Sequence, residues 1–184
     1  GEAELSRELA ETVLPFGTGN THPRFFGWVH GTGLAAGLLA HITASAMNSN
    51  CGGRDHGAIY VERAVIDWTR RIFGLPEIAT GLLTSGTSQS TVIALAAARV
   101  HRIGREIRAD GLRDAPDHIA YCAAGAHSAN QKALELLGHG TQALRRIPAT
   151  GPSGGMDLAR LKEQLAADRA AGKRPFCVIA TIGS

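Results

Sequence analysis

The sequence predicts an α/β protein, in which helices flank a mainly parallel sheet and a helical segment precedes it. From residue 82 on, short apolar runs of strand length alternate with longer segments of helical periodicity. Strands that alternate with helices form parallel sheets that are covered on both faces. Before that point the apolar periodicity is helical. We therefore expect two parts, a helical segment over residues 1–80 and an α/β part over residues 81–184.

The first part has apolar residues at helical spacing. Leu5, Leu9 and Val13 recur every four residues and predict an amphipathic helix that ends before Pro15. The apolar stripe of this helix needs a surface on which to pack, and the neighbouring sequence offers none. Similar spacing predicts two more helices. The expected elements are helices over 1–14, about 34–42 and 61–72, with a loop over 17–29.

The second part follows the order expected of a parallel sheet. A polar loop over 104–117 separates its first helix from the next strand, and Asp157 is a typical helix N-cap. In such sheets ligands bind at the carboxyl ends of the strands. The expected elements are strand 82–84, helix 88–103, strand 118–122, helix 127–137, strand 143–147, helix 157–171 and strand 176–181.

The turn Ser85-Gly86-Thr87-Ser88 follows the first expected strand and opens a helix. Backbone N–H groups that have no partner and the positive end of the helix dipole meet at such a point. The hydroxyls of Thr87 and Ser88 add donors, so the turn predicts a site for a phosphate ester. An ordinary Ser/Thr cap of a helix without any ligand explains the same residues.

His127 occupies the equivalent place after the next strand, in Gly125-Ala126-His127-Ser128. It therefore lies on the side of the sheet where ligands are expected. An imidazole there can take part in proton transfer, although a surface or helix-capping histidine is the alternative.

Composition argues against several classes of function. The net charge of +3 is scattered along the chain, which argues against nucleic acid as a partner. Cys51, Cys122 and Cys177 are odd in number and far apart, as is typical of thiols in a reducing compartment. The apolar stretch 33–47 is too short to span a membrane, and the acidic N-terminus does not resemble a signal peptide. We expect a cytoplasmic protein without membrane contact.

Three competing motifs are weaker. Residues 31–36 fit G-x-G-x-x-A of dinucleotide-binding oxidoreductases, but the residues before Asp55 supply no second strand. Gly86-Thr87-Ser88 approaches the G-x-S-x-G turn of serine hydrolases, with Ser88 as nucleophile, yet lacks the last glycine. Cys51 and His56 fall short of a tetrahedral metal site, so we expect no metal. For the serine hydrolase alternative, the acidic member of the catalytic triad would be Asp110, Asp114 or Asp117.

Several further motifs occur in order from residue 21 to the end of the chain. Together they resemble the pyridoxal-phosphate-dependent group II decarboxylases, which include the aromatic-amino-acid, histidine and glutamate decarboxylases. The motifs are His22-Pro23-Arg24-Phe25-Phe26-Gly27-Trp28, Tyr60-Val61-Glu62-Arg63 leading to Trp68, Phe73-Gly74-Leu75-Pro76, Ser85-Gly86-Thr87-Ser88, Ala126-His127-Ser128, Met156-Asp157 and Pro175 to Ser184.

This resemblance implies a fold-type-I pyridoxal phosphate enzyme, and it assigns roles to matched positions. His127 corresponds to the histidine that stacks on the cofactor ring. Residues 1–80 would include the loop that lines the substrate pocket, and residues 81–184 would form the first part of the large PLP-binding α/β domain. The implied cofactor-binding residues are Ser85, Gly86, Thr87, Ser88, His127, Thr181 and Ser184, and the implied substrate-binding residues are His22, Pro23, Phe25, Phe26, Trp28 and His56.

The resemblance also implies the activity, a PLP-dependent decarboxylation of an L-amino acid, and a homodimer in which the N-terminal segment packs on the other subunit. The aromatic residues of the segment Phe25-Phe26-Gly27-Trp28 favour tyrosine, dopa or tryptophan as substrate. Arg24 and Arg54 keep an acidic substrate open, and a diamino acid or a PLP lyase remain alternatives. The family's Schiff-base lysine and pyridinium-pairing aspartate have no match among these residues. We expect the chain to be the N-terminal part of a longer enzyme.

Overall fold

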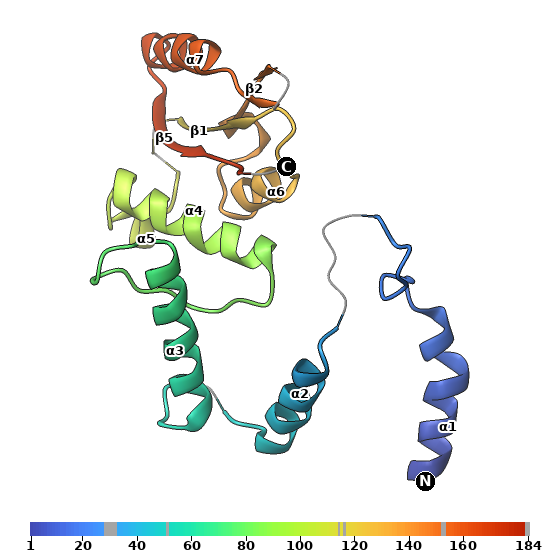
Figure 1. Cartoon of the computed structure of the whole chain (residues 1–184). Coiled ribbons are helices and arrows are strands. Elements are labelled where there is room, and N and C mark those ends of the chain that lie inside the picture. The colour runs from blue at the N-terminus through green and yellow to red at the C-terminus, as the bar shows by residue number, and fades with distance from the viewer. Residues whose placement is uncertain (28–32, 51, 114, 116, 152–153, 183–184) are drawn as a thin grey trace. The chain divides into compact units, whose positions relative to one another are not determined.

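The computed structural model describes residues 1–27, 33–50, 52–113, 115, 117–151 and 154–182 (Figure 1). It divides into two compact units, Gly1–Gly81 and Leu82–Ser184. Each unit is described separately below. Among these residues no helix is long and apolar enough to cross a membrane.

The first unit consists of helices, as its apolar spacing predicts. It contains α1 (Glu2–Thr12), the 3-10 turn η1 (Leu14–Phe16), α2 (Ala35–Met47) and α3 (Gly57–Ile72). The first α-helix ends before Pro15, because a proline ring in the helix would clash with a carbonyl of the preceding turn. Pro15 lies instead in the first turn of η1, where it is tolerated. At the end of α3, Asp67 binds Arg70 and Arg71 one helical turn away.

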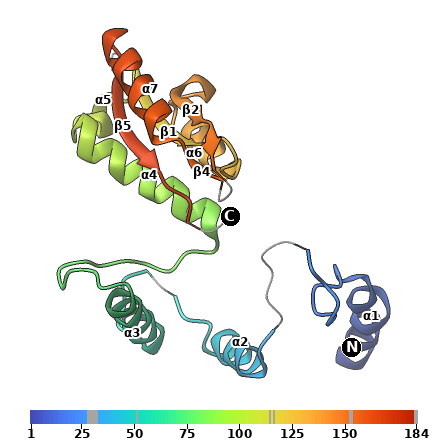
Figure 2. The ribbon, with the colours of Figure 1, turned by 45° about the horizontal axis from the view of Figure 1, so that its top comes forward.

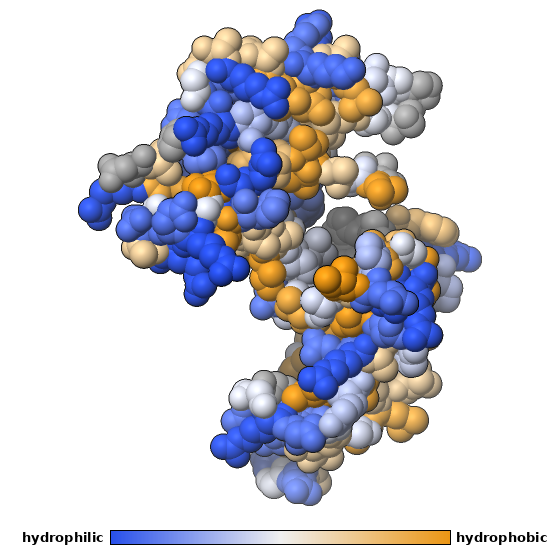
Figure 3. All heavy atoms as spheres, turned by 90° about the vertical axis from the view of Figure 1, so that its left-hand side faces the viewer, coloured by the Kyte–Doolittle hydropathy of each residue, from blue (hydrophilic) through white to orange (hydrophobic). Residues whose placement is uncertain are grey.

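The helices of this unit leave their apolar faces exposed. None of the unit's described residues is buried, and the exposed fraction is 57% for Leu5 and 61% for Trp68. Figure 3 shows hydrophobic side chains at the surface in its lower part. Apolar area of this kind marks a surface that another element or chain covers.

The second unit contains a parallel sheet, which confirms the predicted architecture. Its strands are β1 (His118–Ala123), β2 (Leu144–Ile147) and β5 (Arg174–Ile179), in the order β2-β1-β5. A short antiparallel pair, β3 (Ala149–Thr150) and β4 (Gly155–Met156), follows β2. The helices are α4 (Thr87–Ile103), α5 (Ile107–Asp110), α6 (Ala129–Leu136) and α7 (Leu158–Ala170), with a 3-10 turn η2 (Thr141–Ala143).

Both faces of the sheet are covered, because the side chains of β1 alternate between two apolar clusters. Ala120 and Cys122 pack with Leu134 against α4 and α6. Ile119 and Tyr121 point the other way and pack against α7. Figures 1 and 2 show the resulting three layers, with α7 on one side of the sheet and α4 and α6 on the other.

A polar network is buried under α7. The Tyr121 hydroxyl donates to Asp168 over 2.9 Å, and Arg145 binds the other oxygen of the same carboxylate over 3.0 Å. Gln164 donates a further bond of 3.2 Å. Burial raises the pKa of Asp168, but the hydrogen bonds from Arg145, Gln164 and Tyr121 outweigh it and leave the pKa lowered. Burial and the bond to Asp168 raise the pKa of Tyr121.

Several elements differ from the sequence predictions. The helices expected at about 34–42 and 61–72 are longer and cover Ala35–Met47 and Gly57–Ile72. The expected strand 82–84 has no regular secondary structure, because no strand of the described sheet pairs with it, and a strand requires such a partner. The strand expected at 176–181 covers Arg174–Ile179, so Thr181 lies beyond its end. The polar loop 104–117 contains the short helix α5. The predicted cap is confirmed, since Asp157 accepts bonds from the amides of Ala159 and Arg160.

Candidate active site

The N-terminus of α4 presents free backbone donors. Gly86 is the N-cap residue and offers no side chain, and the first intrahelical bond runs from the amide of Ser90 to the carbonyl of Gly86. Among the described residues, the amides of Thr87, Ser88 and Gln89 have no acceptor. The positive end of the helix dipole lies at the same point. This end of α4 is therefore suited to bind an anion.

The side chains around this turn have two different tasks. Gln89 folds back, and its Oε1 accepts bonds from the Ser85 amide and hydroxyl over 2.8 and 3.0 Å. The Thr84 and Ser90 hydroxyls bind each other over 2.6 Å. These bonds fix the turn. The exposed hydroxyls of Thr87 and Ser88 bind no described residue, so both remain available to a ligand.

His127 lies in the turn between β1 and α6 and is exposed. Its Nδ1 accepts a bond of 3.1 Å from the amide of Ala129, so Nδ1 carries no proton and Nε2 carries it in the neutral ring. Arg146 on the neighbouring strand donates to the carbonyls of Ala124 and Ala126 and holds this turn. The sequence analysis missed Arg146, whose only signal is its place on the adjacent parallel strand.

The topology brings several of these elements to one end of the sheet. The helices α4 and α6 pack against each other on the same face. The parallel register pairs Cys122 of β1 with Ile179 of β5, so His127 and the exposed Thr181 both follow strands that end at one edge. Ser184, which the resemblance also implies for the cofactor, lies outside the described residues.

The residues implied for the substrate lie in the first unit. His22 and Pro23 are exposed, and His22 Nδ1 accepts a bond of 3.1 Å from the Arg24 amide. Phe26 is 92% exposed, whereas Phe25 is half-buried. His56 is the N-cap residue of α3 and is half-buried. Trp28 lies outside the described residues.

The geometry argues against a serine hydrolase. A triad histidine donates its Nδ1–H to a carboxylate, but Nδ1 of His127 accepts a backbone bond instead. Asp117 directly precedes β1 and so lies at the opposite edge of the sheet from His127. Asp110 lies in α5, and Asp114 is outside the described part of the chain.

The dinucleotide-binding interpretation also loses its support. That motif requires a strand, a tight turn and a helix in succession. The described residues of the first unit form helices and no strand, and α2 begins only at Ala35. Residues 31 and 32 of the motif are outside the described residues.

Comparisons with known proteins agree on one family. The family described as Pyridoxal-dependent decarboxylase conserved domain matches residues 2–184. An aromatic-L-amino-acid decarboxylase of Bacillus atrophaeus is 31% identical over 183 residues, which are 98% of this chain and 36% of that protein.

Two solved structures extend the likeness to the fold. The glutamate decarboxylase domain of diaminobutyrate-pyruvate transaminase and L-2,4-diaminobutyrate decarboxylase from Vibrio parahaemolyticus has a TM-score of 0.90 and 28% identity, and covers 98% of this chain and 41% of its own. Oryza sativa TDC with PLP and tryptamine has a TM-score of 0.85 and 29% identity, with coverages of 100% and 39%. The chain thus spans about two fifths of the length of these relatives.

Proposed function

The chain belongs to the pyridoxal-dependent decarboxylase family, and we propose that it forms the cofactor-phosphate site of an enzyme that decarboxylates an L-amino acid. The observation that carries this proposal is the N-terminus of α4, with its three free amides and the free hydroxyls of Thr87 and Ser88. His127 follows the next strand of the same layer and supports the same site.

The residues present fit pyridoxal 5'-phosphate. Its phosphate is a dianion, and Thr87, Ser88 and the adjoining amides supply only donors together with the positive end of a helix. Gly86 carries no side chain, and the space where a Cβ would lie is open to an approaching ligand. Ser85 contributes by fixing the turn through Gln89. Thr181 and Ser184 complete the proposed set.

The bound cofactor supplies an electron sink for the pair that departing carbon dioxide leaves behind. The protein's task is to anchor, orient and move protons. Thr87 and Ser88 anchor the phosphate. His127 offers a flat ring for stacking, and because Nδ1 accepts a backbone bond, Nε2 is the atom that would give or take a proton.

The three lysines of the chain match no His-Lys pair. Lys132 is preceded by Gln131, Lys162 by Leu161 and Lys173 by Gly172. The proposed activity is therefore that of the complete enzyme in which this segment provides the phosphate site and the histidine.

We propose an aromatic substrate, tyrosine, dopa or tryptophan. The exposed Phe26 and half-buried Phe25 supply apolar surface, and the Bacillus atrophaeus relative is named for aromatic amino acids. Arg24 and Arg54 would instead favour an acidic substrate. A diamino acid is a second alternative, since the Vibrio parahaemolyticus structure is named for diaminobutyrate. A third is a different PLP-dependent lyase reaction. Carbon dioxide release from a panel of these amino acids separates the candidates by their kcat/KM values.

Ser88→Ala is expected to weaken cofactor binding about ten- to a hundredfold, because a hydrogen bond to a charged group contributes about 1.5–3 kcal/mol. The measurement is the dissociation constant of pyridoxal phosphate for the complete enzyme. Thr91→Ala is the control, since the Thr91 hydroxyl already donates to the carbonyl of Thr87 within the helix. If a folded Ser88→Ala enzyme bound pyridoxal phosphate as tightly as the parent, the proposed phosphate site at this turn would be wrong.

We propose that the enzyme is a homodimer, because the apolar stripe of α1 has no cover in its own unit. Leu5, Leu9 and Val13 are 57%, 46% and 56% exposed. The double change Leu5→Glu and Leu9→Glu is expected to shift a dimer to monomers at micromolar concentration in sedimentation runs. Glu8→Gln on the same helix serves as control. A stable, fully active monomer of the parent enzyme would contradict the proposal.

We also propose a cytoplasmic location, and the support comes from the thiols. Cys122 and Cys177 are both free, and Cys122 is buried in the core of the second unit. Burial raises the pKa of both thiols, so they remain protonated and unreactive at neutral pH. Such thiols are typical of a reducing compartment.

A further inference from the structure

Four cationic side chains meet at the edge of the sheet that lies opposite the proposed cofactor site. Arg102 lies in the last turn of α4 and Arg169 in the last turn of α7. Lys173 and Arg174 follow where β5 begins. A helix rises about 1.5 Å per residue, so the length of α4 separates Arg102 from Thr87 by about 23 Å.

These four side chains line one hollow of about 270 Å³, which we call the arginine pocket. Its floor contains Phe176 and His118, which are 7% and 6% exposed. Their rings meet edge to face, with centroids 6.4 Å apart. No carboxylate lines this hollow among the residues that the structure describes. The arginine pocket is thus a surface hollow in which three exposed arginines and the half-buried Lys173 surround two buried aromatic rings.

The four cations of the arginine pocket have no side-chain partner in the part of the chain that the structure describes. In the described ranges none of the four forms an ion pair or donates a side-chain hydrogen bond, whereas Arg145 and Arg160 of the same unit are paired with Asp168 and Glu163. The helix dipole stabilises a cation near a helix C-terminus, and this explains the positions of Arg102 and Arg169. It does not account for Arg174 or for the convergence of all four.

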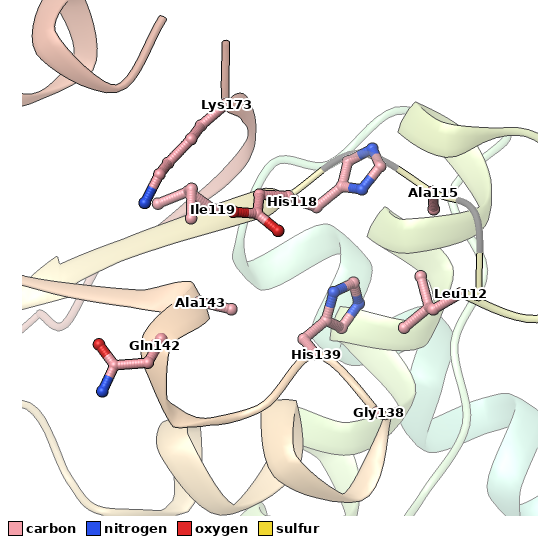
Figure 4. A pocket seen from close by; sticks show the side chains of 10 residues that line it. Leu112, Ala115, His118, Ile119, Gly138, His139, Gln142, Ala143 and Lys173 are labelled. Carbon is pink, nitrogen blue, oxygen red and sulfur yellow. The ribbon is translucent and has the colours of Figure 1, made fainter. Parts of the chain in front are cut away.

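A smaller hollow of about 160 Å³ adjoins the arginine pocket and shares His118 and Lys173 with it (Figure 4). It holds one carboxylate, Asp117, and His139, which stacks on Phe176 at 5.1 Å. Burial, with smaller contributions from Arg99 and His118, lowers the pKa of His139 to about 4, so that ring is neutral at pH 7. His139 therefore adds no positive charge to these hollows.

We propose that the arginine pocket binds a short chain of phosphate groups. Guanidinium groups are planar forks that match phosphate oxygens with two parallel hydrogen bonds, and three of them face one cavity here. Four like charges in one hollow repel one another, and a multiply charged anion removes that repulsion. A triphosphate chain offers enough charge to balance the four cations, which a single carboxylate does not.

The test is the titration of the complete, cofactor-saturated enzyme with inorganic triphosphate by calorimetry. Saturation keeps the phosphate site at α4 filled, so the signal reports a different site. The double change Arg102→Gln and Arg174→Gln is expected to weaken binding at least about tenfold, because two charge-assisted bonds are lost. Lys132→Gln with Lys162→Gln removes the same charge from exposed positions elsewhere in the unit and is expected to leave the affinity within about twofold.

Further arms identify the ligand and separate this site from the cofactor site. Citrate at equal ionic strength is expected to bind at least about tenfold more weakly than triphosphate, since carboxylates match the forks with less charge. If adenosine triphosphate binds more tightly than inorganic triphosphate, the natural ligand is a nucleotide and its phosphate groups occupy the arginine pocket. Ser88→Ala is expected to leave triphosphate binding unchanged, whether or not the proposed function holds. The proposal is overturned by a lack of saturable binding, by equal loss in both double variants, or by citrate that binds equally well.

Discussion

Replacing His127 by alanine is expected to lower kcat of the complete enzyme by about two to four orders of magnitude, the range for a positioned acid-base or orienting group. The reason is geometric. The amide of Ala129 fixes Nδ1, and only Nε2 is left to act on a ligand at the strand end. The fold is expected to persist, because His127 is exposed and packs in neither apolar cluster.

A second variant separates the two tasks of this ring. His127→Phe retains a flat surface for stacking but cannot transfer a proton, so it is expected to bind pyridoxal phosphate nearly as well as the parent and to turn over slowly. His127→Ala is expected to lose part of the binding as well. His101→Ala, an exposed histidine on α4, is the control. A His127→Phe enzyme with the kcat of the parent would show that no proton passes through this residue.

Asp168→Ala is expected to lower the free energy of unfolding by about 3–5 kcal/mol, because it leaves the Arg145 guanidinium and the Tyr121 hydroxyl without their buried partner. Asp168 is 4% exposed, and Tyr121 is fully buried. Urea denaturation at pH 7 measures the change. Glu163→Ala is the control, since its ion pair with Arg160 is about two-thirds exposed and such pairs contribute less than about 1 kcal/mol.

The same carboxylate predicts a pH dependence of stability. Its pKa is lowered in the folded protein, so its contribution is fully present above the unfolded pKa of about 3.9 and is lost as the pH falls through the folded value. The parent is therefore expected to lose stability below about pH 4, and Asp168→Asn is expected to show a smaller loss over the same range. Equal slopes of stability against pH in both proteins would show that Asp168 does not carry this dependence.

The parallel sheet and its helices could be predicted because their signals are local. The apolar runs of strand length and the helical apolar periodicity lie within single segments, and Asp157 is a typical N-cap residue that can be recognised from the local sequence. The turn at Ser85 to Ser88 could also be predicted from its local sequence of small, hydroxyl-bearing residues. The structure adds that the amides of Thr87, Ser88 and Gln89 have no acceptor among the described residues.

What the sequence could not predict depends on contacts between distant residues. The expected strand 82–84 needs a neighbour to pair with, and local composition contains no information on that neighbour. Tyr121 and Asp168 are 47 residues apart, and nothing near either residue points to the other. The support of the His127 turn by Arg146 depends on the register of β1 and β2, which is fixed only when the sheet forms.

The most direct test of the proposed function is carbon dioxide release by the complete enzyme from aromatic L-amino acids, with and without added pyridoxal phosphate. We expect release that requires the cofactor, is accompanied by visible absorption of the bound cofactor, and falls sharply in His127→Ala. An activated ester, offered without cofactor, is the competing substrate. Ester hydrolysis that needs no pyridoxal phosphate and disappears in both Ser88→Ala and His127→Ala, with no carbon dioxide released from any amino acid, would contradict the proposal.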